Sequence, residues 1–319
     1  MSKEKVIEVN NLSKHYGTLK AVDNISFTVY QGEVFGILGP NGAGKTTTLE
    51  MLEGLRELTA GQINILGLDL KQQTNELKQK IGVQLQATSF FDFLTCKETL
   101  DLFGSFYRHA VKSELLLQEV ALEQKADSYV TSLSGGQKQR LSIAMALVND
   151  PEIVFLDEPT TGLDPQARRS LWELVGNIKS KGKTVILTTH YMEEAEQLCD
   201  RVAILDEGRL VALDSPQHLV ERLGDGLINV GVGSADSNLL HTLGTLPRVR
   251  EVRCLDRNGW QEEGERATGS LITIRTDQTK DALREVIRVL DQMGVRVSSL
   301  EVLEPNLNSV FLLLTGKRL

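Results

Sequence analysis

The sequence predicts an α/β domain with a mostly parallel sheet, followed by a smaller α+β domain. Short, fully apolar runs such as residues 34–38 and 153–156 are typical of buried strands, and helical patterns follow them. After residue 226 the order changes to strand, helix, strand, strand, helix, strand, which is the order of a ferredoxin-like sandwich. A chain of 319 residues has room for both domains.

In the first domain, buried strands alternate with loops and helices. The run at 34–38 leads into a Gly-rich loop, and a helix is expected at 137–147. The segment Asp206-Glu207-Gly208 predicts a hairpin turn between two further strands. The expected strands of this domain are 6–9, 25–29, 34–38, 153–156, 184–188, 202–205 and 210–213.

In the second domain, basic residues switch from mostly Lys to mostly Arg, which favours a boundary between two units. Pro216 and the glycines at 224 and 226 punctuate the change, so we expect domains at 1–222 and 223–319. A polar segment at 261–269 predicts a hairpin loop. The expected strands are 227–232, 249–255, 270–276 and 295–303, and the expected helices are 237–243, 280–293 and 309–315.

Charge, cysteine spacing and the length of apolar runs argue against several classes of protein. A net charge of −8 and a pI near 5.3 disfavour a dedicated nucleic-acid binder. The three cysteines are far apart, which predicts neither a zinc site nor a disulfide framework. No signal peptide is expected at the N-terminus, and no run approaches the roughly 18 apolar residues of a membrane span. Any membrane contact is therefore expected through a partner chain.

The loop at 39–46 fits the pattern G-x-x-x-x-G-K-[ST] in full and lies between a predicted strand and a predicted helix. Backbone N–H groups can surround a triphosphate only where side chains stay away, which explains the glycines. Lys45 supplies a positive charge for the β and γ phosphates, and the Thr46 hydroxyl is placed to bind Mg²⁺. The predicted ATP-binding residues here are Gly39, Pro40, Asn41, Gly42, Ala43, Gly44, Lys45, Thr46 and Thr47.

Two carboxylates, Asp157 and Glu158, follow the buried strand at 153–156. A parallel sheet brings such residues to its carboxyl edge, where ligands bind. Neighbouring residues on a strand point in opposite directions, so one carboxylate can face Mg²⁺ while the other faces attacking water. We assign Asp157 to the magnesium shell, and Glu158 either to the general base or to the positioning of the attacking water.

A second Gly-rich helix start narrows the class of nucleotide hydrolase. Residues 133–137, Leu-Ser-Gly-Gly-Gln, precede the helix expected at 137–147 and form a second anion-binding helix N-terminus. Together with the phosphate loop and the carboxylate pair, this segment resembles the ATP-binding cassette (ABC) ATPases, a branch of the P-loop NTPases, over roughly residues 5–220. The matching signature residues are Ser134, Gly135, Gly136 and Gln137.

The resemblance to ABC ATPases implies further site residues and a helical subdomain. Gln86 matches the Q-loop glutamine, which binds Mg²⁺ and water, although Gln84 is a nearby competitor. Asp164 is similar to the D-loop aspartate, and His190 to the switch histidine at the γ-phosphate. Tyr16 matches the aromatic residue that stacks on adenine. The implied catalytic residues are Glu158, His190 and Lys45, and the implied metal ligands are Thr46, Gln86 and Asp157.

The family resemblance also implies partners. It implies a homodimer in which two ATP molecules lie between chains, and a separate membrane permease that would hold the chain at the cytoplasmic face of the cell membrane. Residues 304–316 and the segment Gln84-Leu85-Gln86 look like those of ABC-2-type exporters, the drug- and antibiotic-resistance group. The cargo stays open. Alternatives are a non-transport ABC ATPase acting on ribosomes or DNA, and a ligand-sensing regulator.

Five of the nine phenylalanines fall between residues 90 and 106. One interpretation is that they pack the core of a small helical lobe. The other is that they line an apolar groove for a helix of the permease. The five residues are Phe90, Phe91, Phe93, Phe103 and Phe106.

Overall fold

The computed structural model describes residues 4–86, 89–222, 226–256, 261–262, 265–266, 269–303 and 306–316. The chain divides into two compact units, residues 1–215 and 216–319. The expected boundary between residues 222 and 223 lies at the edge of the described residues. Within the described ranges, no helix is long and apolar enough to cross a bilayer.

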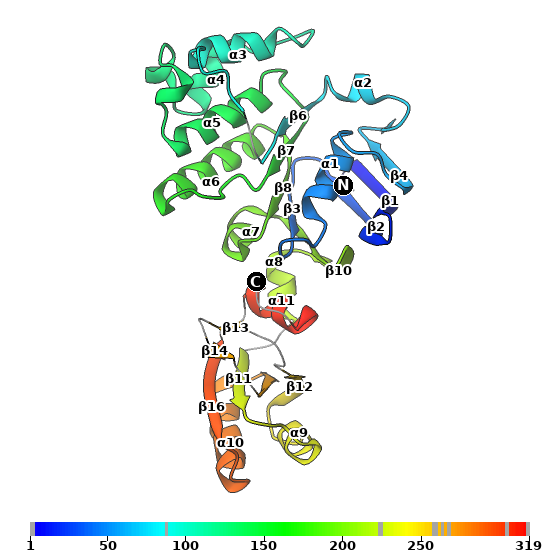
Figure 1. Cartoon of the computed structure of the whole chain (residues 1–319), viewed down its shortest axis with the longest axis vertical. Coiled ribbons are helices and arrows are strands. Elements are labelled where there is room, and N and C mark those ends of the chain that lie inside the picture. Colours follow the sequence, from blue (N-terminus) through cyan, green and yellow to red (C-terminus); the bar gives the residue numbers. More distant parts are fainter. Residues whose placement is uncertain are drawn as a thin grey trace. The chain divides into compact units, whose positions relative to one another are not determined.

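A six-stranded sheet in the order β10-β9-β3-β8-β7-β6 forms the centre of the first unit (Figure 1). All neighbouring strands pair in parallel except the hairpin of β9 and β10. Every residue of β3, β7 and β8 is buried, which explains the apolar runs of β3, of β7 before Asp157 and of residues 185–187 in β8. The strands are β3 (Val34–Leu38), β6 (Ile81–Gln84), β7 (Ile153–Asp157), β8 (Thr184–Thr189), β9 (Arg201–Asp206) and β10 (Arg209–Asp214).

A second, antiparallel sheet in the order β2-β1-β4-β5 packs against the same core. Its first two strands are much longer than the expected 6–9 and 25–29. Polar residues and register shifts interrupt the alternation of the β1–β2 pair, so the sequence pattern shows only part of each strand. The strands are β1 (Lys5–Tyr16), β2 (Leu19–Tyr30), β4 (Ala60–Ile65) and β5 (Leu68–Asp69).

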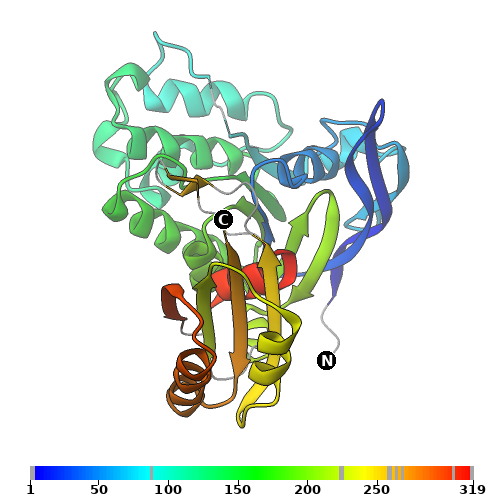
Figure 2. The same cartoon turned by 60° about the horizontal axis from the view of Figure 1, so that its bottom comes forward.

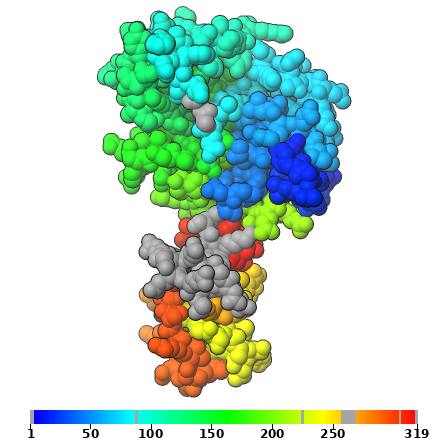
Figure 3. All heavy atoms as spheres, viewed as in Figure 1, coloured from blue at the N-terminus to red at the C-terminus, as the bar shows by residue number. Residues whose placement is uncertain are grey.

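Three helices of the first unit, α3, α4 and α5, pack on one another and form a helical subdomain (Figure 1). The surface of this part of the chain is coloured cyan to green in Figure 3. The expected helix at 137–147 is α5, which begins two residues earlier. The helices of this unit are α1 (Lys45–Leu52), α2 (Thr74–Leu77), α3 (Cys96–Gly104), α4 (Ser113–Glu119), α5 (Gly135–Ala146), α6 (Pro165–Ser180) and α7 (Met192–Leu198), with 3₁₀ turns at Glu123–Lys125 and Val130–Ser132.

The second unit contains a four-stranded antiparallel sheet in the order β12-β15-β11-β16 (Figure 2). Helices α9 and α10 share a core with one face of this sheet, as the strand-helix-strand-strand-helix-strand order predicts. Of the expected hairpin loop at 261–269, the short pair β13–β14 is described, and the rest lies largely outside the described residues. The elements are α8 (Pro216–Glu221), β11 (Gly226–Val232), α9 (Ser237–Gly244), β12 (Val249–Asp256), β13 (Gln261–Glu262), β14 (Glu265–Arg266), β15 (Ser270–Thr276), α10 (Thr279–Gln292), β16 (Val297–Leu303) and α11 (Leu307–Thr315).

Candidate active site

The loop from β3 to α1 needs glycine at two positions. Gly39 has φ 154°, and a Cβ there would lie 2.3 Å from the Leu205 carbonyl oxygen. Gly44, at φ 99°, would place a Cβ 2.5 Å from the Ala21 carbonyl oxygen. Both positions combine a left-handed backbone with a close approach of another strand, so a side chain would displace the loop. The loop therefore keeps its backbone at the sheet edge, directly before the N-terminus of α1.

Lys45, the first residue of α1, points back into this loop. Its Nζ donates to the carbonyl oxygens of Gly39 at 2.8 Å and Pro40 at 3.1 Å. The same Nζ lies 3.5 Å from Glu158 Oε1, and both side chains are buried. Burial lowers the pKa of Lys45, and the nearby Glu158 carboxylate opposes that shift. The loop thus holds a buried cation at the point where an anionic ligand would lie.

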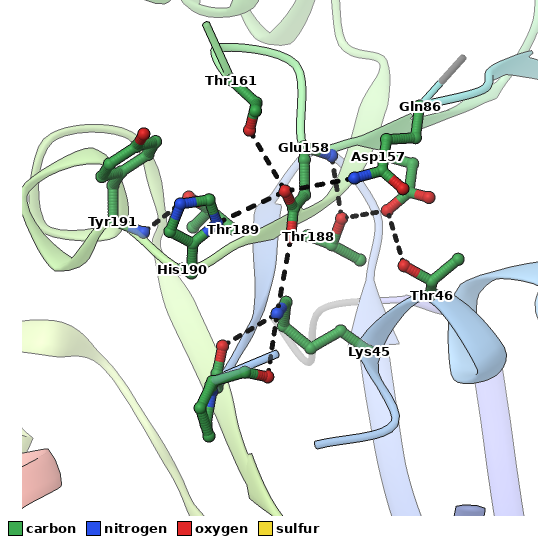
Figure 4. A network of polar contacts seen from close by, with 12 residues as sticks. Lys45, Thr46, Gln86, Asp157, Glu158, Thr161, Thr188, Thr189, His190 and Tyr191 are labelled. Carbon is green, nitrogen blue, oxygen red and sulfur yellow. Dashed lines mark hydrogen bonds and ion pairs between the residues drawn. The ribbon is translucent and has the colours of Figure 1, made fainter. Parts of the chain in front are cut away.

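Asp157 ends β7 and lies between two hydroxyl groups. Thr46 Oγ1 donates to Asp157 Oδ1 at 3.4 Å, and Thr188 Oγ1 donates to the same oxygen (Figure 4). Burial raises the pKa of Asp157, while the two hydroxyls lower it. One carboxylate and one hydroxyl suit Mg²⁺, because this ion takes few protein ligands and keeps waters and substrate phosphates around it. The donor set therefore fits the magnesium site that the sequence predicts.

Glu158 is the point on which the predicted residues converge (Figure 4). Its Oε2 accepts from Gln86 Nε2 at 3.4 Å and from Thr161 Oγ1 at 3.1 Å. His190 Nδ1 lies 3.3 Å from this oxygen, without the alignment of a hydrogen bond. The backbone at Glu158 has φ 45°, a strained value for a residue with a side chain. Strain of this kind is typical of side chains held in place for function.

The pKa of Glu158 is lowered although the group is largely buried. Burial alone would raise this pKa, but the positive charge of Lys45 and the neighbouring His190 outweigh burial. The carboxylate is therefore ionised at neutral pH. Asp157 and Glu158 are adjacent in sequence, yet their pKa values shift in opposite directions. Such divergence is typical of sites that use two carboxyls for different tasks.

An open pocket of about 660 Å³ extends from Lys45 and Glu158 to Tyr16. Tyr16 is half-exposed at the end of β1, and its ring lies near the cations of Lys14 and Arg56, at 5.2 and 5.6 Å. A flat, exposed aromatic face beside a phosphate loop suits the base of a nucleotide. The residues lining the pocket are Tyr16, Leu19, Lys20, Ala21, Asn41, Gly42, Gly44, Lys45, Thr46, Thr47, Gln86, Glu158 and Glu207.

The two candidate glutamines occupy different environments. Gln84 is buried at the end of β6, and its Nε2 donates to the Leu85 carbonyl oxygen at 2.6 Å. Gln86 lies two residues further, lines the pocket with Thr46, and contacts Glu158. Gln86, unlike Gln84, therefore lines the pocket and reaches the Glu158 carboxylate.

The signature residues lie at the start of α5, outside this pocket. Ser134 is the N-cap residue: its hydroxyl accepts from Gln137 N at 3.3 Å, while Gln137 Oε1 accepts from Ser134 N at 2.9 Å. This reciprocal capping box leaves the N–H groups of Gly135 and Gly136 at the helix start. None of these four residues lines the pocket around Lys45. A single chain therefore does not bring its two anion-binding helix starts together.

Asp164 and His190 begin two segments that touch each other. Asp164 caps α6, its Oδ1 accepting from Ala167 N at 2.9 Å. His190 precedes α7, and its ring packs against Tyr191, with centroids 4.1 Å apart. The Arg168 guanidinium of α6 lies over that Tyr191 ring at 4.5 Å. The D-loop helix and the histidine segment are therefore in direct contact.

Sequence reasoning missed one residue of the site, Thr188, and one buried carboxyl of the neighbouring helix α7, Glu194. Thr188 bonds Asp157 and also accepts from Glu158 N at 2.9 Å. The parallel register that pairs Asp157 with Thr188 is the signal that points to it. Glu194 of α7 is fully buried, and its Oε1 accepts from Trp172 Nε1 of α6 at 3.3 Å. No local pattern distinguishes Glu194 from the exposed Glu193 beside it.

The phenylalanines between residues 90 and 106 are not a core. Phe91, Phe93 and Phe106 are exposed, Phe93 to 90%. The interpretation that this group packs the helical lobe is wrong for these three residues. Next to them, Phe90 lines an open pocket that includes Gln86 and Lys138.

Fold and site together define a P-loop nucleotide hydrolase with a helical subdomain. Comparisons with known proteins identify the family. The family described as ABC transporter matches residues 22–161. The chain is 46% identical to Nod factor export ATP-binding protein I of Burkholderia lata over 220 residues, which are 67% of this chain and 72% of that protein. It is 36% identical to daunorubicin resistance ATP-binding protein DrrA2 of Streptomyces coeruleorubidus, over 98% of this chain and 95% of that protein.

A solved structure matches the first unit. The dimeric post-hydrolysis state of the ATP-binding cassette MJ0796, bound to ADP and Pi, aligns with a TM-score of 0.60 and 28% identity, covering 66% of this chain and 98% of that chain. The protein belongs to the ABC transporter family. It is an ATP-binding subunit of that family and an ATPase, as the fold and the phosphate loop predict.

Proposed function

We propose that this site hydrolyses MgATP by positioning and electrostatic stabilisation. The contacts around Glu158 carry the proposal, because they bring three separate segments, with Lys45, Gln86 and His190, to one carboxylate. Glu158, ionised and facing the pocket, accepts the proton of the attacking water. Lys45 neutralises the β and γ phosphates, and His190 contacts the γ-phosphate. Thr46, Gln86 and Asp157 hold Mg²⁺, which offsets phosphate charge when bound. The loop from Gly39 to Thr47 surrounds the phosphates, and Tyr16 stacks on adenine.

The complete site is formed by two copies of the chain. Ser134, Gly135, Gly136 and Gln137 lie outside the pocket of their own chain, so a second copy supplies them to the γ-phosphate. Asp164 lies in the same interface, at the D-loop. The dimeric state of the related cassette bound to ADP and Pi supports this assembly. ATP then stabilises the dimer, because it binds the closed pair more tightly than either open chain.

A separate membrane permease is the proposed partner, with export as the direction of transport. The relatives named for Nod factor export and daunorubicin resistance support export, and the second of them spans nearly the whole chain. The side chains of Phe91, Phe93 and Phe106 are exposed and apolar, which suits contact with a helix of the permease. The chain would then act at the cytoplasmic face of the membrane, driving a cargo that the permease selects.

A mixing experiment tests the two-chain site. Lys45→Ala removes the phosphate cation, and Ser134→Asp keeps the helix cap while it turns a negative charge toward the γ-phosphate. Each variant alone has no intact site, so ATP turnover is expected to be lost in both. When the two are mixed, Lys45 of one chain meets Ser134 of the other, and each mixed dimer regains one intact site.

The outcome separates a site built by two chains from a site within one. Recovery of phosphate release in the mixture, with dependence on Mg²⁺, supports the proposal. Wild-type turnover of Ser134→Asp alone, or no recovery on mixing, would contradict it. Ser132→Asp serves as the control, because it places the same charge two residues before the helix cap.

A further inference from the structure

Strand β16 is an open edge of the sheet in the second unit. It pairs with β11 from Val297 to Leu303, and among the residues described in this unit no strand pairs with its other side. Six of its seven residues are exposed. The opposite edge strand, β12, is mostly half-buried. A long, exposed edge strand presents unpaired N–H and C=O groups to another chain.

The side chains of β16 extend the apolar core to this edge. Leu300 pairs with Val230 and Val302 pairs with Ile228, and paired residues of antiparallel strands point to the same face. Val230 and Ile228 belong to the core under α9 and α10. Leu300 and Val302 are nevertheless 42% and 46% exposed. The apolar face of the sheet therefore continues past the helices that cover it.

The usual protection of an edge is limited to the first residues of this strand. Natural edge strands carry Lys, Pro, inward-pointing charges or β-bulges that prevent pairing. The register of β16 against β11 shifts between Val297 and Ser299, whereas residues 299–303 pair without interruption. Residues 298–303, Ser-Ser-Leu-Glu-Val-Leu, contain neither Lys nor Pro, and their one charged residue is Glu301. The strand is thus suited in length and composition to accept a further strand.

We propose that β16 pairs with β16 of a second copy of this chain, antiparallel, with the two-fold axis at Leu300. Leu300 then faces Leu300 of the second copy, and Glu301 faces Ser299. The two sheets join into one of eight strands, and the apolar faces that end at each edge become continuous.

The chemistry of the strand selects this partner and this register. An axis at Glu301 would place two carboxylates opposite each other, and an axis at Ser299 would place Glu301 opposite Val297; both pairings are unfavourable. The axis at Leu300 avoids both. A second copy is the occupant because the strand is complementary to itself. This proposal rests on the proposed function in one respect, because ATP bound between two cassettes would raise the effective concentration of one β16 near the β16 of the second copy.

Disulfide trapping of the full chain tests the contact. In a Cys254→Ser background the remaining native cysteines, Cys96 and Cys199, are buried. Leu300→Cys is expected to form a disulfide-linked dimer under mild oxidation, at least about tenfold faster than Arg284→Cys, an exposed position on α10. Both are measured without nucleotide and, in a Glu158→Gln chain, with MgATP. The absence of a linked dimer at Leu300→Cys in both states would overturn the proposal, as would equal rates at the two positions.

A mixture of two further variants tests the register. Ser299→Cys and Glu301→Cys are opposite each other in the proposed pairing, so the mixed disulfide is expected to exceed both self-linked products severalfold. Dominance of either self-linked product would overturn the axis at Leu300.

A charge variant gives a readout without oxidation. Leu300→Lys places two like charges opposite each other at the two-fold axis. The association constant of the dimer without nucleotide is therefore expected to fall roughly tenfold or more. Ile287→Lys, on α10 and exposed to a similar extent, should leave it unchanged. If ATP dimerises the Glu158→Gln chain while Leu300→Cys never cross-links, this proposal fails and the proposed function stands. If Leu300→Cys cross-links and ATP has no effect on dimerisation, the β16 contact stands and the ATP-dependent dimer of the proposed function fails.

Discussion

Replacing Glu158 by Gln keeps the shape of the side chain and removes its charge. The carboxylate lies 3.5 Å from Lys45 Nζ, and two donors, Gln86 and Thr161, contact its Oε2. An amide oxygen still accepts from these donors. The attraction to Lys45, about 4 to 5 kcal/mol at an effective dielectric near 20, is lost. Lys45 is then free to bind phosphate, so ATP affinity is expected to be kept or increased.

Turnover of Glu158→Gln is expected to fall about 10²- to 10⁴-fold, since the amide is a far weaker base. That factor corresponds to about 3 to 5 kcal/mol of activation free energy. Phosphate release, equilibrium ATP binding and light scattering give turnover, affinity and mass on one sample, and an ATP-stabilised dimer is expected. Glu152→Gln, an exposed carboxylate before β7, is the matched control. Turnover near the wild-type rate in Glu158→Gln would refute the assignment, as would a parallel loss of ATP binding.

Three further changes test other parts of the site. Tyr16→Ala is expected to weaken ATP binding by about 1–3 kcal/mol, whereas Tyr16→Phe keeps the ring and should bind normally; equal affinity of Tyr16→Ala in equilibrium binding would contradict stacking. Gly39→Ala should abolish ATP binding, because its Cβ would lie 2.3 Å from the Leu205 carbonyl oxygen. Gly67→Ala, also at a positive φ but in open space, is the control. Burial raises the pKa of Glu53 to about 8, with Asp157 and Glu50 adding to the effect. The folded chain therefore binds this proton more tightly than the unfolded chain, so stability should fall as pH rises from about 4.5 to 8, by up to about 1.4 kcal/mol per pH unit. Glu53→Gln should flatten that slope in thermal unfolding, and an unchanged slope would contradict the assignment.

The phosphate loop and the carboxylate pair could be predicted because strand burial and residue chemistry coincide there. A strand buried on both faces leaves no alternative to an apolar run, so β3 and β7 are visible in the sequence and fix where Lys45, Asp157 and Glu158 emerge. The order of elements in the second unit follows from the same kind of pattern.

Contacts between distant segments were less accessible. Thr188 looks like any polar residue at a strand end until the register pairs it with Asp157. The burial of Glu194 depends on how α6 and α7 pack, which no local pattern encodes. Phe91 and Phe93 are as apolar as core residues, yet they lie on the surface. Apolar character alone does not distinguish a core residue from an exposed one, so the sequence left both interpretations open.

The ion pair of Lys45 and Glu158 has a consequence for how the resting protein behaves. Without nucleotide, the Lys45 ammonium lies beside the Glu158 carboxylate. The carbonyl oxygens of Gly39 and Pro40 accept hydrogen bonds from the same ammonium. In the proposed mechanism the triphosphate replaces Glu158 as the partner of Lys45, so ATP binding and release of the proposed base coincide. Without nucleotide, the same two groups stay paired with each other.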